Sequence, residues 1–251
     1  MTNILLNGCN GKMGRVITDL VAPKDNAHIV AGIDLTPTQN SDFPVFPLVS
    51  ECTVACDVII DFSHPTALEL LLKYAVSTKT PIVVATTGLS SAQVETLRKA
   101  SSQIPVFYSA NMSIGICLLK ELVKKATDFL GNDFDIEIVE RHHNQKVDAP
   151  SGTALAIADA INSVNTDKYQ YIYDRHNKNA KRSKHEIGIS AVRGGNIVGD
   201  HEVIFAGNNE VIEINHFAMS RNLFADGAIR AAIFLKSKEP GFYDMESLLQ
   251  G

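Results

Sequence analysis

A short stretch in the second half of the chain gathers residue types that could transfer a proton and hold an anion. His142 and His143 are adjacent, and Lys146 follows three residues later. Histidine exchanges a proton near neutral pH without help from its surroundings, and lysine adds a positive charge and a second acid. The Ser-Gly-Thr triplet at 151–153 then begins a helical pattern, where backbone N–H groups can bind a carboxylate or phosphate. The stretch predicts an enzyme site that binds a small anion and protonates it.

The composition of the chain limits the classes of protein to which it can belong. Its 251 residues fit one large or two small domains, and 45% hydrophobic residues can bury a core. A net charge of −5 argues against a nucleic-acid partner. Because the sequence has neither an 18-residue apolar run nor a basic leader, we expect a cytoplasmic protein without membrane contact. No second Cys/His pair accompanies Cys52 and Cys56, so we expect free thiols and no metal site.

Apolar runs typical of buried strands alternate with helical patterns through the first half of the chain. The expected strands are residues 4–7, 29–34, 58–62, 82–85 and 106–109, and the expected helices are residues 12–21, 65–77, 91–102 and 114–130. This alternation indicates βαβ units and a parallel sheet. The fold class is therefore α/β, with a nucleotide-binding type of sheet in the first domain.

The turn between the first expected strand and helix carries Gly8, Gly11 and Gly14. Glycines at this place let the backbone approach a pyrophosphate, and the helix start favours its negative charge. The spacing differs from the usual G-x-G-x-x-G, so a tight turn without a ligand is the alternative. Asp34 lies 20 residues after Gly14, where an acid can bind the ribose hydroxyls of a dinucleotide.

The same acid bears on the choice between NADH and NADPH. No Arg or Lys directly follows Asp34, although Lys12 in the glycine turn could reach a 2′-phosphate. We expect NADH to be at least as good a donor as NADPH. The segments at 85–88 and 109–112 end two later strands, and they would line the same crevice, because ligands of open α/β sheets bind at the carboxyl ends of the strands.

The pattern changes from about residue 134. Residues 135–140 alternate polar and apolar, residues 153–162 are helical, and strand patterns follow at 185–192, 197–205 and 210–217. They predict an antiparallel or mixed sheet that is open on one face, a candidate subunit interface. The polar segment 169–184 is interpreted as a solvated loop.

The end of the chain has a helical pattern at 222–236 and a short stretch at 244–249, which could return to the first sheet. The expected domains are therefore residues 1–112 with 222–251 (dinucleotide binding) and residues 113–221 (substrate binding and oligomerisation). The two crossings, at 112–113 and 220–221, are hinge candidates.

Together these motifs resemble the bacterial dihydrodipicolinate reductases, or 4-hydroxy-tetrahydrodipicolinate reductases, of diaminopimelate and lysine biosynthesis. The resemblance covers the whole chain and is most specific in the His-His-x-x-Lys-x-Asp-Ala-Pro-Ser-Gly-Thr-Ala block at 142–154. It implies a homotetramer with a Rossmann-type domain and an α+β C-terminal domain. It also implies hydride transfer from NADH and/or NADPH to C4 of a cyclic imine dicarboxylate, with loss of its hydroxyl as water.

The resemblance further implies roles for individual residues. His142 resembles the general acid that protonates C3, and Lys146 the second proton donor. The substrate contacts it implies are His143, Gly152 and Thr153, to which the helix start adds Ser151. The cofactor contacts are Gly8, Cys9, Asn10, Gly11, Lys12, Met13, Asp34, Ala85, Thr86, Thr87, Ser109, Ala110, Asn111 and Met112. Leu35 and Phe217 depart from the family, since members often carry basic residues there.

Several residues have a structural interpretation beside the functional one. Asp148 is expected to order its loop or to orient Lys146, and His201 and His216 are expected to be structural histidines on strands. Arg221 suits a hinge and a substrate carboxylate equally well. Two other functions compete with the reductase: a dehydrogenase acting on an amino-acid semialdehyde, and a non-catalytic NAD sensor. The first lacks a Cys beside the histidine pair, and the second has no use for two proton donors.

Overall fold

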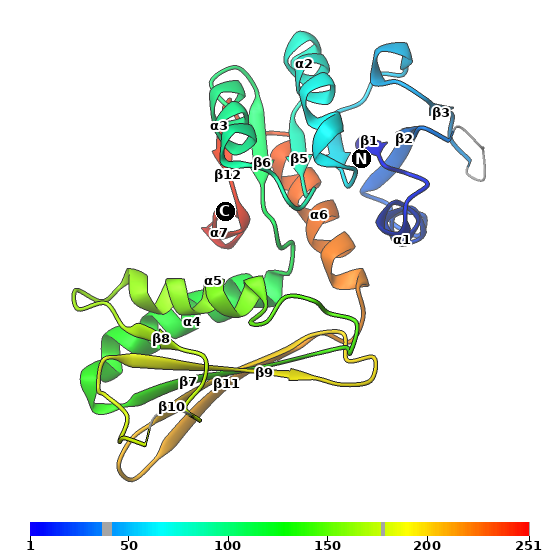
Figure 1. Cartoon of the computed structure of the whole chain (residues 1–251). Helices are drawn as coiled ribbons and strands as arrows, with labels where there is room; N and C mark the ends of the chain where they lie inside the picture. The colour runs from blue at the N-terminus through cyan, green and yellow to red at the C-terminus, as the bar shows by residue number, and fades with distance from the viewer. Residues whose placement is uncertain (37–41, 177–178, 251) are drawn as a thin grey trace. The chain divides into compact units, whose positions relative to one another are not determined.

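A computed structural model describes residues 1–36, 42–176 and 179–250 of the chain. The chain forms two compact units, shown in Figure 1. Unit 1 consists of Met1–Ser113 and Asn222–Gly251, and unit 2 of Ile114–Arg221. Ser113 therefore belongs with unit 1 rather than with the second domain, where the sequence had placed it. Within the described ranges, no helix has the length and apolar content needed to cross a bilayer.

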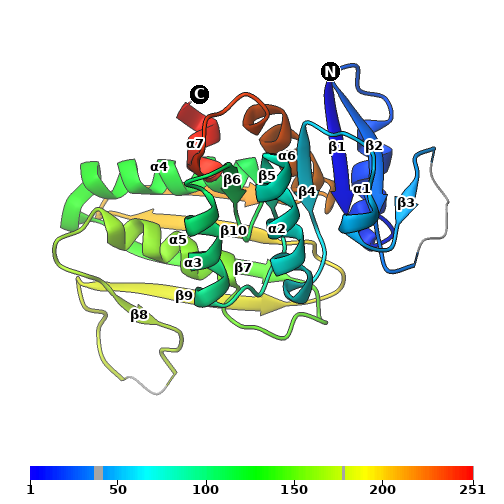
Figure 2. The same cartoon turned by 90° about the horizontal axis from the view of Figure 1, so that it is seen from above.

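Unit 1 is built on one parallel sheet of seven strands, and Figure 2 shows the part of this sheet that runs from β6 to β3. The order is β12 (Gly241–Tyr243), β6 (Pro105–Tyr108), β5 (Ile82–Val84), β4 (Val58–Asp61), β1 (Thr2–Asn7), β2 (Ala27–Ile33) and β3 (Val45–Phe46). The predicted Rossmann-type sheet is confirmed. The sequence missed β3 and β12, because strands of two or three residues are too short to show a period.

Helices cover this sheet and return the chain to it. They are α1 (Lys12–Val21), α2 (Leu68–Thr78), α3 (Ser91–Ala100), α6 (Asn222–Leu235) and α7 (Met245–Gln250), with short 3₁₀ turns η1 (Val49–Glu51) and η2 (Pro65–Ala67). From β1 the chain adds β2 on one side of the sheet, and from β4 it adds β5 and β6 on the other side. Because crossovers between parallel strands are right-handed, α1 lies on one face of the sheet, and α2 and α3 lie on the opposite face. The carboxyl ends of β1 and β4 meet where the order reverses, which is where such sheets bind ligands.

Unit 2 is a mixed sheet with two helices on one face (Figure 1). Its strands, in spatial order, are β11 (Val211–Phe217), β10 (Asp200–Ala206), β7 (Asp135–His142), β9 (Glu186–Arg193) and β8 (Gln170–Ile172). β10 is antiparallel to both of its neighbours, whereas β7, β9 and β8 are parallel. The helices are α4 (Ile114–Leu130), which leads to β7 through η3 (Gly131–Asp133), and α5 (Gly152–Ser163), which follows β7. This confirms the mixed sheet and, for α4, both predicted ends.

Side-chain alternation on β7 decides what lies beneath the helices. Ile136 and Ile138 are buried in a core with residues of α4 and α5, including Val123 and Ile157. Successive strand residues point to opposite faces, so every second residue of β7 faces the helices. The same face therefore continues from Ile138 to two polar residues at the end of the strand.

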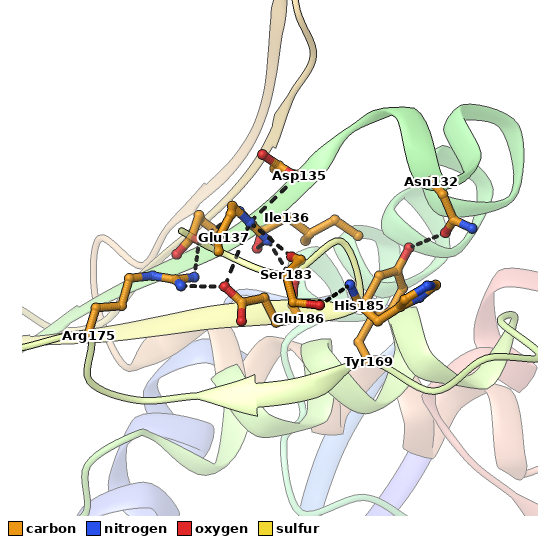
Figure 3. Close-up of polar contacts among 10 residues, drawn as sticks. Asn132, Asp135, Ile136, Glu137, Tyr169, Arg175, Ser183, His185 and Glu186 are labelled. Atoms are coloured by element: carbon orange, nitrogen blue, oxygen red, sulfur yellow. Dashed lines mark hydrogen bonds and ion pairs between the residues drawn. The ribbon is translucent and has the colours of Figure 1, made fainter. Parts of the chain in front are cut away.

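The segment at 169–184 is only in part the solvated loop that its composition suggested, since most of its described residues from 173 onward are exposed and lie outside helices and strands. Tyr169 is buried, and β8 follows it at the edge of the second sheet. Arg175 pairs with Glu137 and Glu186, as Figure 3 shows. Arg182 also pairs with Glu137, at 2.9 Å. The interpretation missed these ion pairs because the cations bind acids on β7 and β9, a pairing that only the register of the sheet creates.

Candidate active site

The end of β7 carries a histidine hydrogen-bonded to a buried carboxylate. Glu140 is fully buried and His142 is 8% exposed. His142 Nδ1 lies 2.6 Å from Glu140 Oε2. The two residues are two positions apart on one strand, so both face the helix side of the sheet. The strand thereby holds the imidazole ring against an acid, with its other nitrogen turned away from that acid.

Glu140 is a carboxylate whose burial is balanced by hydrogen bonds. Arg193 Nη1 donates to Oε2 and Nη2 to Oε1, both at 2.7 Å, and the Ser151 backbone N–H donates to Oε1 at 2.9 Å. Burial alone would raise the pKa of Glu140, but the hydrogen bonds from Arg193, His142 and Ser151 outweigh it and hold that pKa below its usual range. Glu140 therefore stays ionised between Arg193 and His142.

His201 is a second ring in this cluster. It lies opposite Glu140 in the β7–β10 ladder and meets His142 edge to face, with ring centroids 5.2 Å apart. Its Nε2 is 3.1 Å from Ser151 Oγ. Burial, followed by the positive charge of His142, lowers the pKa of His201 to about 3. His201 is therefore neutral at ordinary pH, which agrees with a structural role, although the structure places it in the site.

Lys146 lies on the loop that joins β7 to α5. Its backbone N–H donates to the His143 carbonyl, and its Nζ is 2.9 Å from Asp148 Oδ1. The hydrogen bond from Lys146 is the largest reason that the pKa of Asp148 is lowered, and the Gly152 N–H contributes as well. This geometry agrees with the expectation that Asp148 orients Lys146.

The start of α5 is organised by Ser151, its N-cap. Ser151 Oγ accepts a hydrogen bond from the Ala154 N–H, while its own N–H donates to Glu140. Both groups are therefore used inside unit 2, so Ser151 supports the site rather than offering these groups to a ligand. Gly152 is exposed, and His143 and Thr153 are half-buried.

The glycine turn of unit 1 is compact. Gly8 has a φ of +81°, and a Cβ there would lie 2.5 Å from the Phe62 carbonyl oxygen. A Cβ on Gly14 would lie 2.2 Å from the Gly8 carbonyl oxygen. Crowding thus explains why glycine stands at positions 8 and 14. This is what the alternative interpretation, a tight turn without a ligand, predicted. Gly11 is the exposed N-cap of α1, with Lys12 exposed and Met13 half-buried beside it.

Asp34 lies beside this turn, at the end of β2. Its carboxylate accepts hydrogen bonds from the backbone N–H groups of Asn10, at 3.0 Å, and Thr36, at 3.1 Å. Cys9 is buried beneath the turn, and burial raises the pKa of its thiol to about 11. The turn predicted to bind the pyrophosphate and the acid predicted to bind the neighbouring ribose hydroxyls are therefore adjacent.

A pocket of about 350 Å³ lies at the strand ends of unit 1. It is lined by Met13, Phe62, Ser63, Ala85, Thr86, Thr87, Ala110, Met112 and Phe224. Six of these were predicted cofactor contacts, which the structure thus brings together. A larger groove, of about 800 Å³, lies against η2, α2 and α3, but none of its lining residues is a predicted site residue.

The carboxylate of Asp61 ties these strand ends together. It is fully buried and accepts hydrogen bonds from Asn7 Nδ2, Ser63 Oγ and Thr86 Oγ1. The hydroxyl of Thr86 is therefore used within unit 1. In the next loop, Ser109 Oγ donates to the Asn111 carbonyl oxygen at 2.7 Å. These bonds hold the loops that line the pocket.

The residues that the structure describes contain no candidate set of metal ligands. Across residues 1–36, 42–176 and 179–250, no three His, Cys, Asp or Glu side chains form a group that could hold an ion. All four cysteines are free thiols.

Sequence reasoning missed three polar residues: Glu140 and Arg193 beside His142, and Asp61 at the strand ends of unit 1. Glu140 could have been found, since it shares the alternation of β7 with His142. The other two, Arg193 and Asp61, reach their partners only through strand register, because β9 pairs with β7 and β4 with both β1 and β5. Without that register, they look like ordinary strand-end residues.

The fold resembles those of solved structures whose sequences are distant from this one. A probable dehydrogenase from Thermotoga maritima is 13% identical, with a TM-score of 0.66, covering 99% of this chain and 92% of that chain. A dipicolinate-bound dihydrodipicolinate reductase from Paenisporosarcina sp. TG-14 is 24% identical, with a TM-score of 0.82, covering 97% of both chains. These likenesses show a two-domain α/β fold.

The family is shown by sequence. Residues 2–112 match the family described as dihydrodipicolinate reductase, N-terminus, and residues 115–249 match its C-terminus. Relatives named 4-hydroxy-tetrahydrodipicolinate reductase are 51% identical in Clostridium tetani, over 99% of this chain and 97% of the relative, and 52% identical in Caldanaerobacter subterraneus subsp. tengcongensis, over 100% and 99%. The chain belongs to the dihydrodipicolinate reductase family. This confirms the resemblance drawn from the sequence.

Proposed function

We propose that this chain is a 4-hydroxy-tetrahydrodipicolinate reductase, which forms tetrahydrodipicolinate for lysine and diaminopimelate biosynthesis. The observation that carries the proposal is the 51–52% identity to relatives of that name along essentially the whole chain. The reaction needs a reduced dinucleotide, a dicarboxylate site and a proton donor. The residues for each are present in the two units.

Unit 1 suits a dinucleotide cofactor, NADH and/or NADPH, which supplies the hydride. The α1 N-terminus and the glycine turn suit the pyrophosphate, and Asp34 suits the ribose hydroxyls. The pocket at the strand ends suits the nicotinamide end. Because a carboxylate at the ribose repels a 2′-phosphate, NADH should be used at least as well as NADPH, and a strong NADPH preference in kcat/KM would contradict this.

Unit 2 suits the substrate. His143, Lys146, Gly152 and Thr153 would hold its carboxylates, since cations and helix-start N–H groups bind anions. After hydride reaches C4, the ring carries an excess of electrons and takes a proton at C3. His142 is the proposed acid, because Glu140 holds Nδ1 and leaves Nε2 to donate. Positioned acid catalysis typically contributes about 10²–10⁴-fold.

The remaining expectations concern the cell and the assembly. We propose that the enzyme acts in the cytoplasm as a homotetramer, that unit 1 binds the dinucleotide, and that unit 2 binds the substrate and forms the subunit contacts. The segments at 112–113 and 220–221 connect the units and remain hinge candidates. The roles of Arg221 and Phe217 also remain predictions, with Phe217 58% exposed at the end of β11.

A coupled assay tests the activity. We expect the purified chain to consume NADH with the cyclic imine and to be inhibited competitively by pyridine-2,6-dicarboxylate, which resembles the planar dicarboxylate ring. An amino-acid semialdehyde and simple aldehydes should give no change in NADH absorbance. Oxidation of NADH with the semialdehyde but not with the imine would replace the proposal with the competing dehydrogenase function. NADH binding without turnover on either would favour the sensor.

A further inference from the structure

The bidentate contact between Arg193 and Glu140 lies directly behind the ring of His142. We propose that Glu140 and Arg193 are positioning residues of the reductase: Arg193 fixes the Glu140 carboxylate, and Glu140 fixes the His142 ring with Nδ1 protonated, so that Nε2 is the atom that donates. This inference rests on the proposed function of His142 as the acid. It assigns roles to two residues that the motifs left without one.

The geometry leaves Glu140 one orientation. Arg193 binds both carboxylate oxygens at 2.7 Å, and the Ser151 N–H takes a further position on Oε1 at 2.9 Å. A guanidinium fork that binds a carboxylate at two points fixes its plane as well as its position. The His142 Nδ1 contact at 2.6 Å therefore meets a carboxylate that cannot turn away.

An acceptor on Nδ1 also decides the tautomer of the ring. Ionised Glu140 can only accept, so the shared proton stays on Nδ1 in both charge states of His142. Proton transfer then breaks the Nε2–H bond and forms a C–H bond at C3 of the substrate. The neutral ring left behind is the Nδ1–H tautomer, which water or buffer protonates again at Nε2.

The backbone around the ring keeps Nε2 open. Gly199 faces it, and a Cβ at that position would lie 3.0 Å from Nε2. Any larger side chain would therefore cover the donating atom. On the other side, Gly194 N–H donates to the His142 carbonyl oxygen, at 3.0 Å. Arg193 also donates to the Asp148 carbonyl oxygen, at 2.7 Å, and so fixes the loop that carries Lys146.

A double-mutant cycle tests the proposal. Glu140→Gln removes the charge and lets the amide donate to Nδ1, so we expect kcat to fall by at least about tenfold, while KM for NADH stays within about twofold. The alkaline limb of the kcat–pH profile should move to lower pH, because the imidazolium loses its anion. Combined with His142→Gln, it should add no further loss, since both changes remove one function.

Matched variants separate positioning from folding. Glu202→Gln makes the same change in another arginine-paired carboxylate, bound to Arg141, and should leave kcat and its pH profile unchanged. Arg193→Lys keeps the charge without the fork and should retain more activity than Arg193→Met. Should Glu140→Gln fail to fold, Glu140→Asp, which retracts the carboxylate by one methylene, gives the same readouts.

The outcomes distinguish the acid role of His142 from the positioning role of Glu140 and Arg193. Normal turnover of His142→Gln would remove the acid role, and with it the proposed mechanism. A slow His142→Gln with a normal Glu140→Gln, or with fully additive losses in the double variant, would leave the mechanism intact and overturn the positioning role. A loss confined to KM would also overturn it.

Discussion

His142 and Lys146 are held by different kinds of structure. The His142 ring is bound to a fully buried carboxylate on a regular strand, whereas Lys146 lies on an irregular loop and pairs with Asp148, whose side chain is 58% exposed. An ion pair with one exposed partner is partly hydrated and is screened by salt. Lys146 can therefore exchange Asp148 for a substrate carboxylate at small cost, while His142 keeps its orientation throughout.

Removal of either proposed acid should slow turnover without loss of cofactor. We expect His142→Gln and Lys146→Ala each to lower kcat by at least about tenfold, because a positioned acid contributes that much or more. NADH binding, measured by fluorescence titration, should stay the same, since the predicted cofactor contacts belong to unit 1. Unchanged turnover in both variants would refute the assigned roles.

His201 should make stability depend on pH. Its folded-state pKa of about 3 lies below the usual 6.5, so below pH 6.5 the unfolded chain takes up a proton that the folded chain refuses. The stability contributed by neutral His201 is complete above pH 6.5 and is lost as the pH falls toward 3. Between pH 7 and pH 5 we expect the free energy of unfolding to fall by up to about 2 kcal/mol.

Urea unfolding at pH 7 and pH 5 measures this effect. The loss should be smaller in His201→Asn than in the unchanged protein. It should not vanish, because burial also lowers the pKa of His216 and acts in the same direction. Equal losses in the two proteins would contradict the prediction.

Among the elements, the regular ones were predictable and the short or polar ones were not. Helices α1 and α4 begin and end at the predicted residues, since both show an apolar period of about 3.6 residues. Strand β8 was missed because it lies in a stretch of polar composition. Arg175 and Arg182, which follow it, pair with Glu186 on β9 and Glu137 on β7. Local pattern could predict the core strands but not contacts that depend on register.

The turn between β1 and α1 should not tolerate a side chain at Gly14. Gly14→Ala would place a Cβ 2.2 Å from the Gly8 carbonyl oxygen and 2.5 Å from that of Cys9, so the turn must open. We expect a destabilisation of about 1–3 kcal/mol and weaker NADH binding. Gly194→Ala is the control, since a Cβ there meets no atom within 4 Å. Equal stability and NADH affinity in the two variants would show that the turn tolerates a side chain.

At the scale of the whole molecule, the open face of the second sheet predicts assembly. Helices cover only one face, and β11 exposes Val211 at 57% and Phe217 at 58%. Apolar residues exposed on a sheet often mark a contact between subunits. We expect sedimentation equilibrium to give about four times the 27.3 kDa chain mass, and Val211→Asp to lower it. A monomeric mass at micromolar concentration would contradict the homotetramer.

The sequence by itself determined the fold class, the family and the residues that could carry the chemistry. These follow from local period and from motifs whose members are close in the chain, such as the block from His142 to Ala154. Only the tertiary structure decided which carboxylate holds the ring of His142. Glu140 meets Arg193 across 53 residues, and Asp61 meets Asn7 across 54, because strand register, which no local pattern records, brings them together.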